Sequence, residues 1–151
     1  MNEKEMLGNT KGDKTYFLTL VNDGYGQLTW SKKDYCEDLE SLQKEVGGLI
    51  QCAEWFFPNL QERNIDTWVN EEGKLEGLPI TTILKNDGNL LEVLVGNLCF
   101  IRHDDEGNSF GLTEEDVDFV KSEIKRVLTK PLTNSGWEYS LPTGYELEVC
   151  A

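Results

Sequence analysis

Histidine is nearly absent from this sequence, since His103 is the only one among 151 residues. Metal sites built from several histidines are therefore excluded, and a Ser–His or Cys–His pair would have a single candidate base. His103 follows an expected strand and precedes an acidic turn, where an exposed histidine without a chemical role is the common outcome. We therefore predict no catalysis through His103.

The motifs of common enzyme families are also missing. No P-loop, Gly-X-Gly-X-X-Gly, Gly-X-Ser-X-Gly or His-Glu-X-X-His sequence occurs, and Gly47-Gly48 lacks the lysine of a phosphate-binding loop. The segment from Asp104 to Glu115 has oxygen-bearing side chains at several EF-hand positions, but Ser109 replaces the required glycine and no helix is expected before it. The sequence thus predicts no catalytic residue, no metal and no cofactor, and favours a binding protein over an enzyme.

Long apolar runs and closely spaced cysteines are lacking as well. No stretch reaches the roughly 18 apolar residues that a membrane span requires, and residues 1–14 contain no apolar core of a secretory signal. The cysteines are far apart in the chain: Cys36, Cys52, Cys99 and Cys150. We expect reduced thiols and a cytoplasmic location without a membrane anchor.

Negative charge, in contrast, is abundant. The chain has 28 Asp and Glu against 14 Lys and Arg, a formal net charge of −14. Such a field repels nucleic acids and anionic lipid surfaces and attracts basic protein surfaces. Direct nucleic-acid binding is therefore disfavoured. The acidity either attracts a basic partner or only keeps the protein in solution.

Hydrophobic patterning predicts an α+β fold, with a small mixed or antiparallel sheet packed against two main helices. The Asn22-Asp23-Gly24 turn should join the first two strands as a hairpin. Strands are expected at residues 15–21, 27–31, 49–57, 65–69 and 94–101.

Helices are expected where apolar residues recur at helical spacing. One should start at a cap on Asp34 and end at Gly47-Gly48, and another should start at a cap on Thr113 and stop at Pro131. Residues 80–85 are expected to form one or two helical turns before Asn86-Asp87-Gly88.

The ends of the chain complete the expected organisation. Residues 1–14 read as a flexible leader and residues 15–151 as a single α+β domain. Residues 137–149 should add a short strand or a packed arm. The aromatic run Trp55-Phe56-Phe57 is expected to be buried on both sides, or else to offer one side as an anchor for a partner.

The middle of the chain, roughly residues 40–120, resembles an uncharacterised domain family found mainly in phages and other mobile elements. The residues that carry the resemblance are Leu42, residues 46–50 (VGGLI), 69–79 (VNEEGKLEGLP), 95–97 (VGN) and 112–116 (LTEED). Ile80-Thr81 stands where the family pattern suggests an asparagine. The resemblance implies an accessory protein of a virus or mobile element in the cytoplasm of a bacterial host, and it supplies no catalytic residue.

Three functions fit these observations. The first is a non-enzymatic counter-defence inhibitor that binds the basic nucleic-acid groove of a host defence protein, such as a CRISPR effector or restriction nuclease. Its partner-binding carboxylates would be Glu71, Glu72, Asp104, Asp105, Glu106, Glu114 and Glu115. The second is a sponge for a nucleotide second messenger, with a pocket formed by Trp68, Lys74 and Arg102. The third is a Mg²⁺-dependent nuclease or hydrolase that uses Asp and Glu alone.

Overall fold

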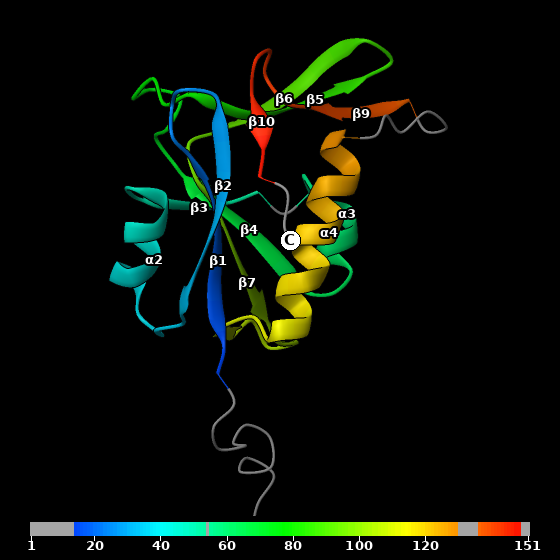
Figure 1. Ribbon diagram of the computed structural model, residues 1–151. Coiled ribbons are helices and arrows are strands. Elements are labelled where there is room, and N and C mark those ends of the chain that lie inside the picture. Colours follow the sequence, from blue (N-terminus) through cyan, green and yellow to red (C-terminus); the bar gives the residue numbers. More distant parts are fainter. Residues whose placement is uncertain (1–13, 54, 130–135, 149–151) are drawn as a thin grey trace, which may run out of the picture.

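The computed structural model describes residues 14–53, 55–129 and 136–148, and it shows an α+β chain (Figure 1). The strands are β1 (Tyr16–Asn22), β2 (Gln27–Asp34), β3 (Ile50–Cys52), β4 (Ile65–Asn70), β5 (Ile80–Asn86), β6 (Asn89–Val95), β7 (Leu98–His103), β8 (Ser109–Phe110), β9 (Trp137–Ser140) and β10 (Glu146–Leu147). The helices are α2 (Leu39–Val46), α3 (Pro58–Gln61) and α4 (Glu114–Thr129).

The strands form two sheets rather than the one expected. The larger sheet has the order β10-β2-β1-β7-β4-β3, with β8 paired to β7, and the smaller sheet has the order β6-β5-β9. All pairs are antiparallel except β10 with β2. The second sheet arises because residues 80–95 form a hairpin of their own.

Helices cover both faces of the larger sheet. In Figure 1, α2 lies on one face and α4 with α3 on the other. Side chains of β1 alternate between the two faces. Phe17 packs with Leu42 and Val46 of α2, whereas Leu18 joins the larger core that includes Ile124 of α4.

The first hairpin and the C-terminal end of α2 are as predicted. β1 and β2 pair in continuous register from Tyr16↔Asp34 to Asn22↔Leu28. Gly47, with φ 82°, ends α2 in the left-handed conformation that glycine favours. The expected cap at Asp34 is wrong, because Asp34 still belongs to β2. Asp38 caps α2 instead, accepting a hydrogen bond from the Ser41 backbone N–H at 2.6 Å.

The helical turns expected at residues 80–85 are wrong, because this segment is strand β5. Its β-branched residues suit a strand, and Asp87 (φ 49°) and Gly88 (φ 84°) form the tight turn into β6. A periodicity of about two turns was too short to separate a buried helix from a buried strand.

Two other strand boundaries also differ. The expected strand at 94–101 is the end of β6 and most of β7, separated at Gly96, whose φ is 73°. The expected strand at 49–57 is only Ile50–Cys52, because Pro58 occupies the first turn of α3 rather than merely ending a strand. The sheet therefore has a short edge strand, and the aromatic run lies in a turn.

The C-terminal region contributes two strands. β9 joins the small sheet beside β5, and β10 pairs with β2 at the edge of the large sheet. The leader up to residue 13, the expected helix stop at Pro131, and both Val149 and Cys150 lie outside the described residues. No helix in the described part of the chain is long and apolar enough to cross a membrane.

Candidate partner-binding site

The predicted carboxylates Asp104, Asp105 and Glu106 lie on the turn between β7 and β8, which we call the acidic turn (residues 104–108). Asp104 stabilises the turn itself. Its carboxylate accepts hydrogen bonds from the Glu106 N–H, the Asn108 N–H and the Asn108 side-chain amide at 2.8–3.0 Å. The bonds from Asn108 chiefly lower the Asp104 pKa. Asp105 and Glu106 are exposed, and no ion pair to either occurs in the described chain.

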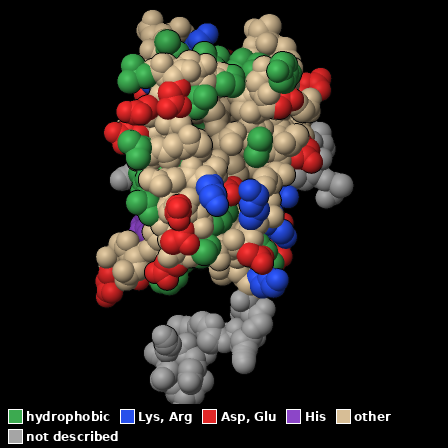
Figure 2. Space-filling view, turned by 90° about the vertical axis from the view of Figure 1, so that its left-hand side faces the viewer, with side chains coloured by type: hydrophobic (Ala, Val, Ile, Leu, Met, Phe, Trp, Pro, Cys, Tyr) green, Lys and Arg blue, Asp and Glu red, His purple; other side chains and the backbone are tan. Residues whose placement is uncertain are grey.

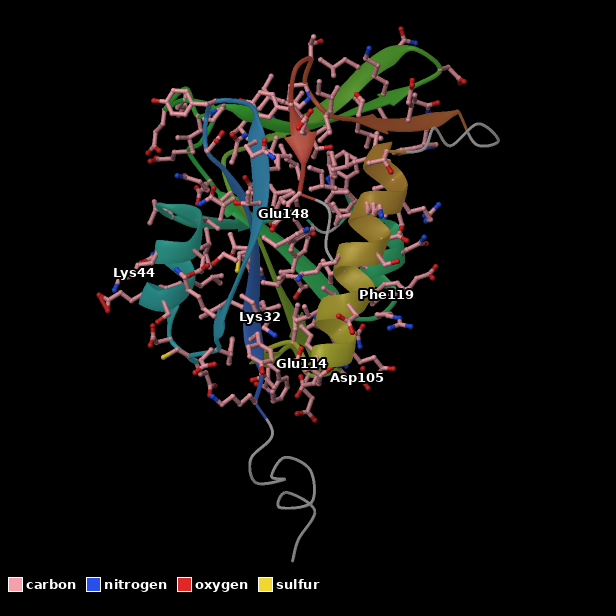
Figure 3. All side chains as sticks on the ribbon, in the orientation of Figure 1. Lys32, Lys44, Asp105, Glu114, Phe119 and Glu148 are labelled. Atoms are coloured by element: carbon pink, nitrogen blue, oxygen red, sulfur yellow. The ribbon has the colours of Figure 1, made fainter. Side chains whose placement is uncertain are left out.

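Glu114 and Glu115 begin helix α4 close to the same end of the sheet. The bridge between Tyr16 and Leu112 fixes this segment against β1, and Figure 3 shows Glu114 and Asp105 at the same end of the molecule. Both Glu114 oxygens lie 3.2 Å from Lys32, which lowers the Glu114 pKa. Glu115 is exposed and has no ion pair among the described residues.

Glu71 and Glu72 lie at the opposite end of the sheet. They follow β4, and β4 runs antiparallel to β7, with Ile65 opposite Arg102. The end of β4 is therefore distant from the acidic turn, and Figure 2 shows acidic side chains towards both the upper and lower ends of one face. The structure brings five of the seven predicted carboxylates to one end, which we call the acidic end: Asp104, Asp105, Glu106, Glu114 and Glu115.

The three residues of the alternative nucleotide pocket are not brought together. Lys74 pairs with Glu92 and lines a pocket of about 230 Å³ between β3 and β6. Arg102 pairs with Asp116 at 3.0 Å. Trp68 lines a different pocket, beside α2. Both cations already have carboxylate partners, so the geometry provides no shared phosphate site.

The pocket beside α2, here called the aromatic pocket, was not found from sequence. Its volume is about 360 Å³. Phe17, Tyr35 and Trp68 form its aromatic walls, while Glu37, Asp38, Gly107, Asn108 and Ser109 line its polar side. The acidic turn therefore contributes directly to one rim. The signal was too dispersed to find in sequence, because the walls come from β1, β4 and the loop before α2.

Electrostatic features of the aromatic pocket favour positive charge. Burial, followed by the negative charge of Glu37, raises the Tyr35 pKa. Glu37 and Asp38, both carboxylates, line the same pocket. The Phe17 and Tyr35 rings lie 5.0 Å apart at 53°. An aromatic wall beside carboxylates is the environment in which organic cations are bound.

His103 and the aromatic run have mainly structural contacts. His103 Nδ1 lies 2.9 Å and 3.0 Å from the two oxygens of Asp66, which also accepts from the Gln61 amide. Phe56 and Phe57 are buried, whereas Trp55 is 52 % exposed, so two-sided burial is wrong for Trp55 and its use as an anchor stays a prediction. No cluster of three or more His, Cys, Asp or Glu side chains is placed to hold a metal among the described residues.

Comparison with known proteins identifies the class of this chain. The model of a family described as a domain of unknown function, DUF3846, matches residues 18–126. The chain therefore belongs to the DUF3846 family. Searches of curated proteins and of solved structures found no match.

Proposed function

We propose that this protein is a non-catalytic binding domain whose acidic end binds a basic surface of a partner protein. The observation that carries the proposal is the position of Asp105, Glu106 and Glu115. All three are exposed at one end of the sheet, and none is in an ion pair with a described residue. The ion pairs of the described structure use other carboxylates, so this charge is available to a partner.

The partner that fits best is a nucleic-acid-binding protein. Such proteins hold phosphates in grooves rich in Arg and Lys, and a rigid acidic surface competes for the same groove. A host defence nuclease, such as a CRISPR effector or restriction enzyme, is the specific partner we propose. The protein would then act as a counter-defence inhibitor in a bacterial cell.

Matched double variants test this proposal. Asp105→Asn with Glu106→Gln removes two charges from the acidic end, and Glu71→Gln with Glu72→Gln removes two from an exposed turn at the other end. Each protein is used to capture partners from host lysate at low and high salt, with quantitative mass spectrometry. We expect the first variant to capture about 5- to 30-fold less partner, since each exposed pair contributes about 0.5–1 kcal/mol. The second variant should capture as much as wild type.

The captured protein must also behave as a groove-binding partner. Added DNA or RNA should compete for it, and capture should weaken strongly with salt because exposed charges are screened. Equal loss in both variants would show that only total charge matters. Capture unaffected by salt and by nucleic acid would contradict the proposal.

A further inference from the structure

The charged groups around the aromatic pocket leave it with surplus negative charge. Glu37 and Asp38 line it, and no Lys or Arg is among the described residues that do so. Lys33, opposite Phe17 in the hairpin, is held 3.1 Å from the buried Glu45. The one histidine near this face is paired with Asp66. Lys33 and His103 therefore already have partners, and Lys44 of α2 acts through its charge on Asp38. Glu37 has no ion pair within the described chain.

The lining and the volume of the pocket select among cations. A planar guanidinium can stack on aromatic rings and at the same time donate to a carboxylate, whereas an ammonium is a compact and strongly hydrated charge. The volume of about 360 Å³ lies near the lower limit, roughly 300 Å³, of pockets that bind small ligands. A single long side chain suits this volume better than a nucleotide does.

We propose that the aromatic pocket binds one arginine side chain of the basic partner, with its guanidinium between Tyr35 and Glu37. This inference rests on the proposed function and names what the partner presents. Trp68 also lines the pocket, so the signal of its indole N–H reports whether the pocket is occupied. The acidic turn beside the pocket attracts the surrounding basic surface.

The test uses the full chain and two short peptides. One is acetyl-Gly-Arg-Gly-amide, and the other replaces arginine with citrulline, which has nearly the same shape without the charge. Nuclear magnetic resonance follows the four tryptophan indole N–H signals, and the Trp68→Phe variant assigns that of Trp68. We expect a saturable shift of the Trp68 signal with the arginine peptide only, and smaller shifts of the other three.

Variants locate the binding. Glu37→Gln should weaken arginine-peptide binding about two- to fivefold, as expected for one exposed ion pair. Glu71→Gln, in the distant turn, should leave it unchanged. A Trp68 signal that stays still up to about 10 mM peptide would overturn the inference, as would equal shifts with citrulline or tighter binding of the corresponding lysine peptide.

The experiments test the proposed function of the acidic end separately from the arginine pocket. If Asp105→Asn with Glu106→Gln abolishes partner capture while Glu37→Gln and Trp68→Phe leave it intact, the acidic end binds the partner and the arginine pocket is refuted. If the arginine peptide binds but the acidic-end variant captures normally, the pocket is real and the groove-binding function is refuted.

Discussion

Burial separates the carboxylates of this protein into two groups. Asp66, Asp116 and Glu123 are at most 8 % exposed, and each is held by a basic side chain. Removing such a partner would leave a charge stranded in a poorly solvated site, so these residues stabilise the fold. Asp105, Glu106 and Glu115 of the acidic end are exposed and lack this constraint. Substituting them should therefore alter binding with little effect on folding.

The cysteines provide a residue-level test of the packing. Burial raises the pKa of Cys99 from 9.0 to about 12, whereas Cys36 is exposed. Because the thiolate is the reactive form, iodoacetamide at about pH 8 should label Cys36 in the native protein and Cys99 only after unfolding. Mass spectrometry of the labelled peptides measures both. Rapid native labelling of Cys99 would contradict the packing of β7 under α2.

The same shift of the Cys99 pKa sets the direction of a pH effect. Below about pH 9 both the folded and unfolded states hold the thiol proton, so Cys99 adds no pH dependence there. Above about pH 9 the Cys99 thiol loses its proton in the unfolded state but keeps it in the folded state. The free energy of unfolding should therefore fall as pH rises towards 12. Tyr139, whose pKa burial raises from 10.0 to about 12, acts in the same direction.

At the scale of elements, helix α4 starts with a reciprocal cap. The Asp116 N–H donates to the Thr113 hydroxyl at 3.1 Å, and the Thr113 N–H donates to the Asp116 carboxylate at 3.0 Å. Thr113→Ala should therefore lower the free energy of unfolding by about 1 kcal/mol, while Thr113→Ser, which keeps the accepting hydroxyl, should leave it nearly unchanged. Urea denaturation compares the two. Equal stability of the alanine variant and wild type would show that the cap contributes nothing.

Local signals explain which elements could be predicted from sequence. The cap at Thr113, the glycine at the end of α2 and the first hairpin depend on neighbouring residues, and the structure confirms them. The strand at residues 80–86 was missed because its identity depends on pairing with both β6 and β9. Tertiary pairing of this kind overrides weak local preference.

The candidate site shows the same division. The acidic end could be anticipated in part, because Asp104 to Glu106 and Glu114 to Glu115 are close in sequence. Glu71 and Glu72 lie at the opposite end of the sheet because β4 pairs antiparallel with β7. No local sequence pattern reveals this pairing. The aromatic pocket draws its lining from segments as far apart in the chain as Phe17 and Ser109, and sequence spacing gave no sign of it.

At the scale of the whole molecule, the net charge of −14 opposes folding through self-repulsion. The Debye length, over which salt screens a charge, shortens from about 30 Å at 0.01 M salt to about 8 Å at 0.15 M. We expect the melting temperature to rise by about 2–4 °C over this range, corresponding to roughly 1 kcal/mol. Differential scanning calorimetry in NaCl measures it. A falling melting temperature would mean that the exposed ion pairs outweigh the repulsion.

The pairing of β10 with β2 has a consequence for biosynthesis. Residues 146–147 lie beside residues 27–28, and the backbone N–H of Trp30 donates to Glu148. Residues 146–147 are synthesised long after residues 27–28, so this side of β2 stays uncovered until β10 has left the ribosome. Until then, a nascent chain must avoid pairing through this edge with neighbouring chains on the same messenger.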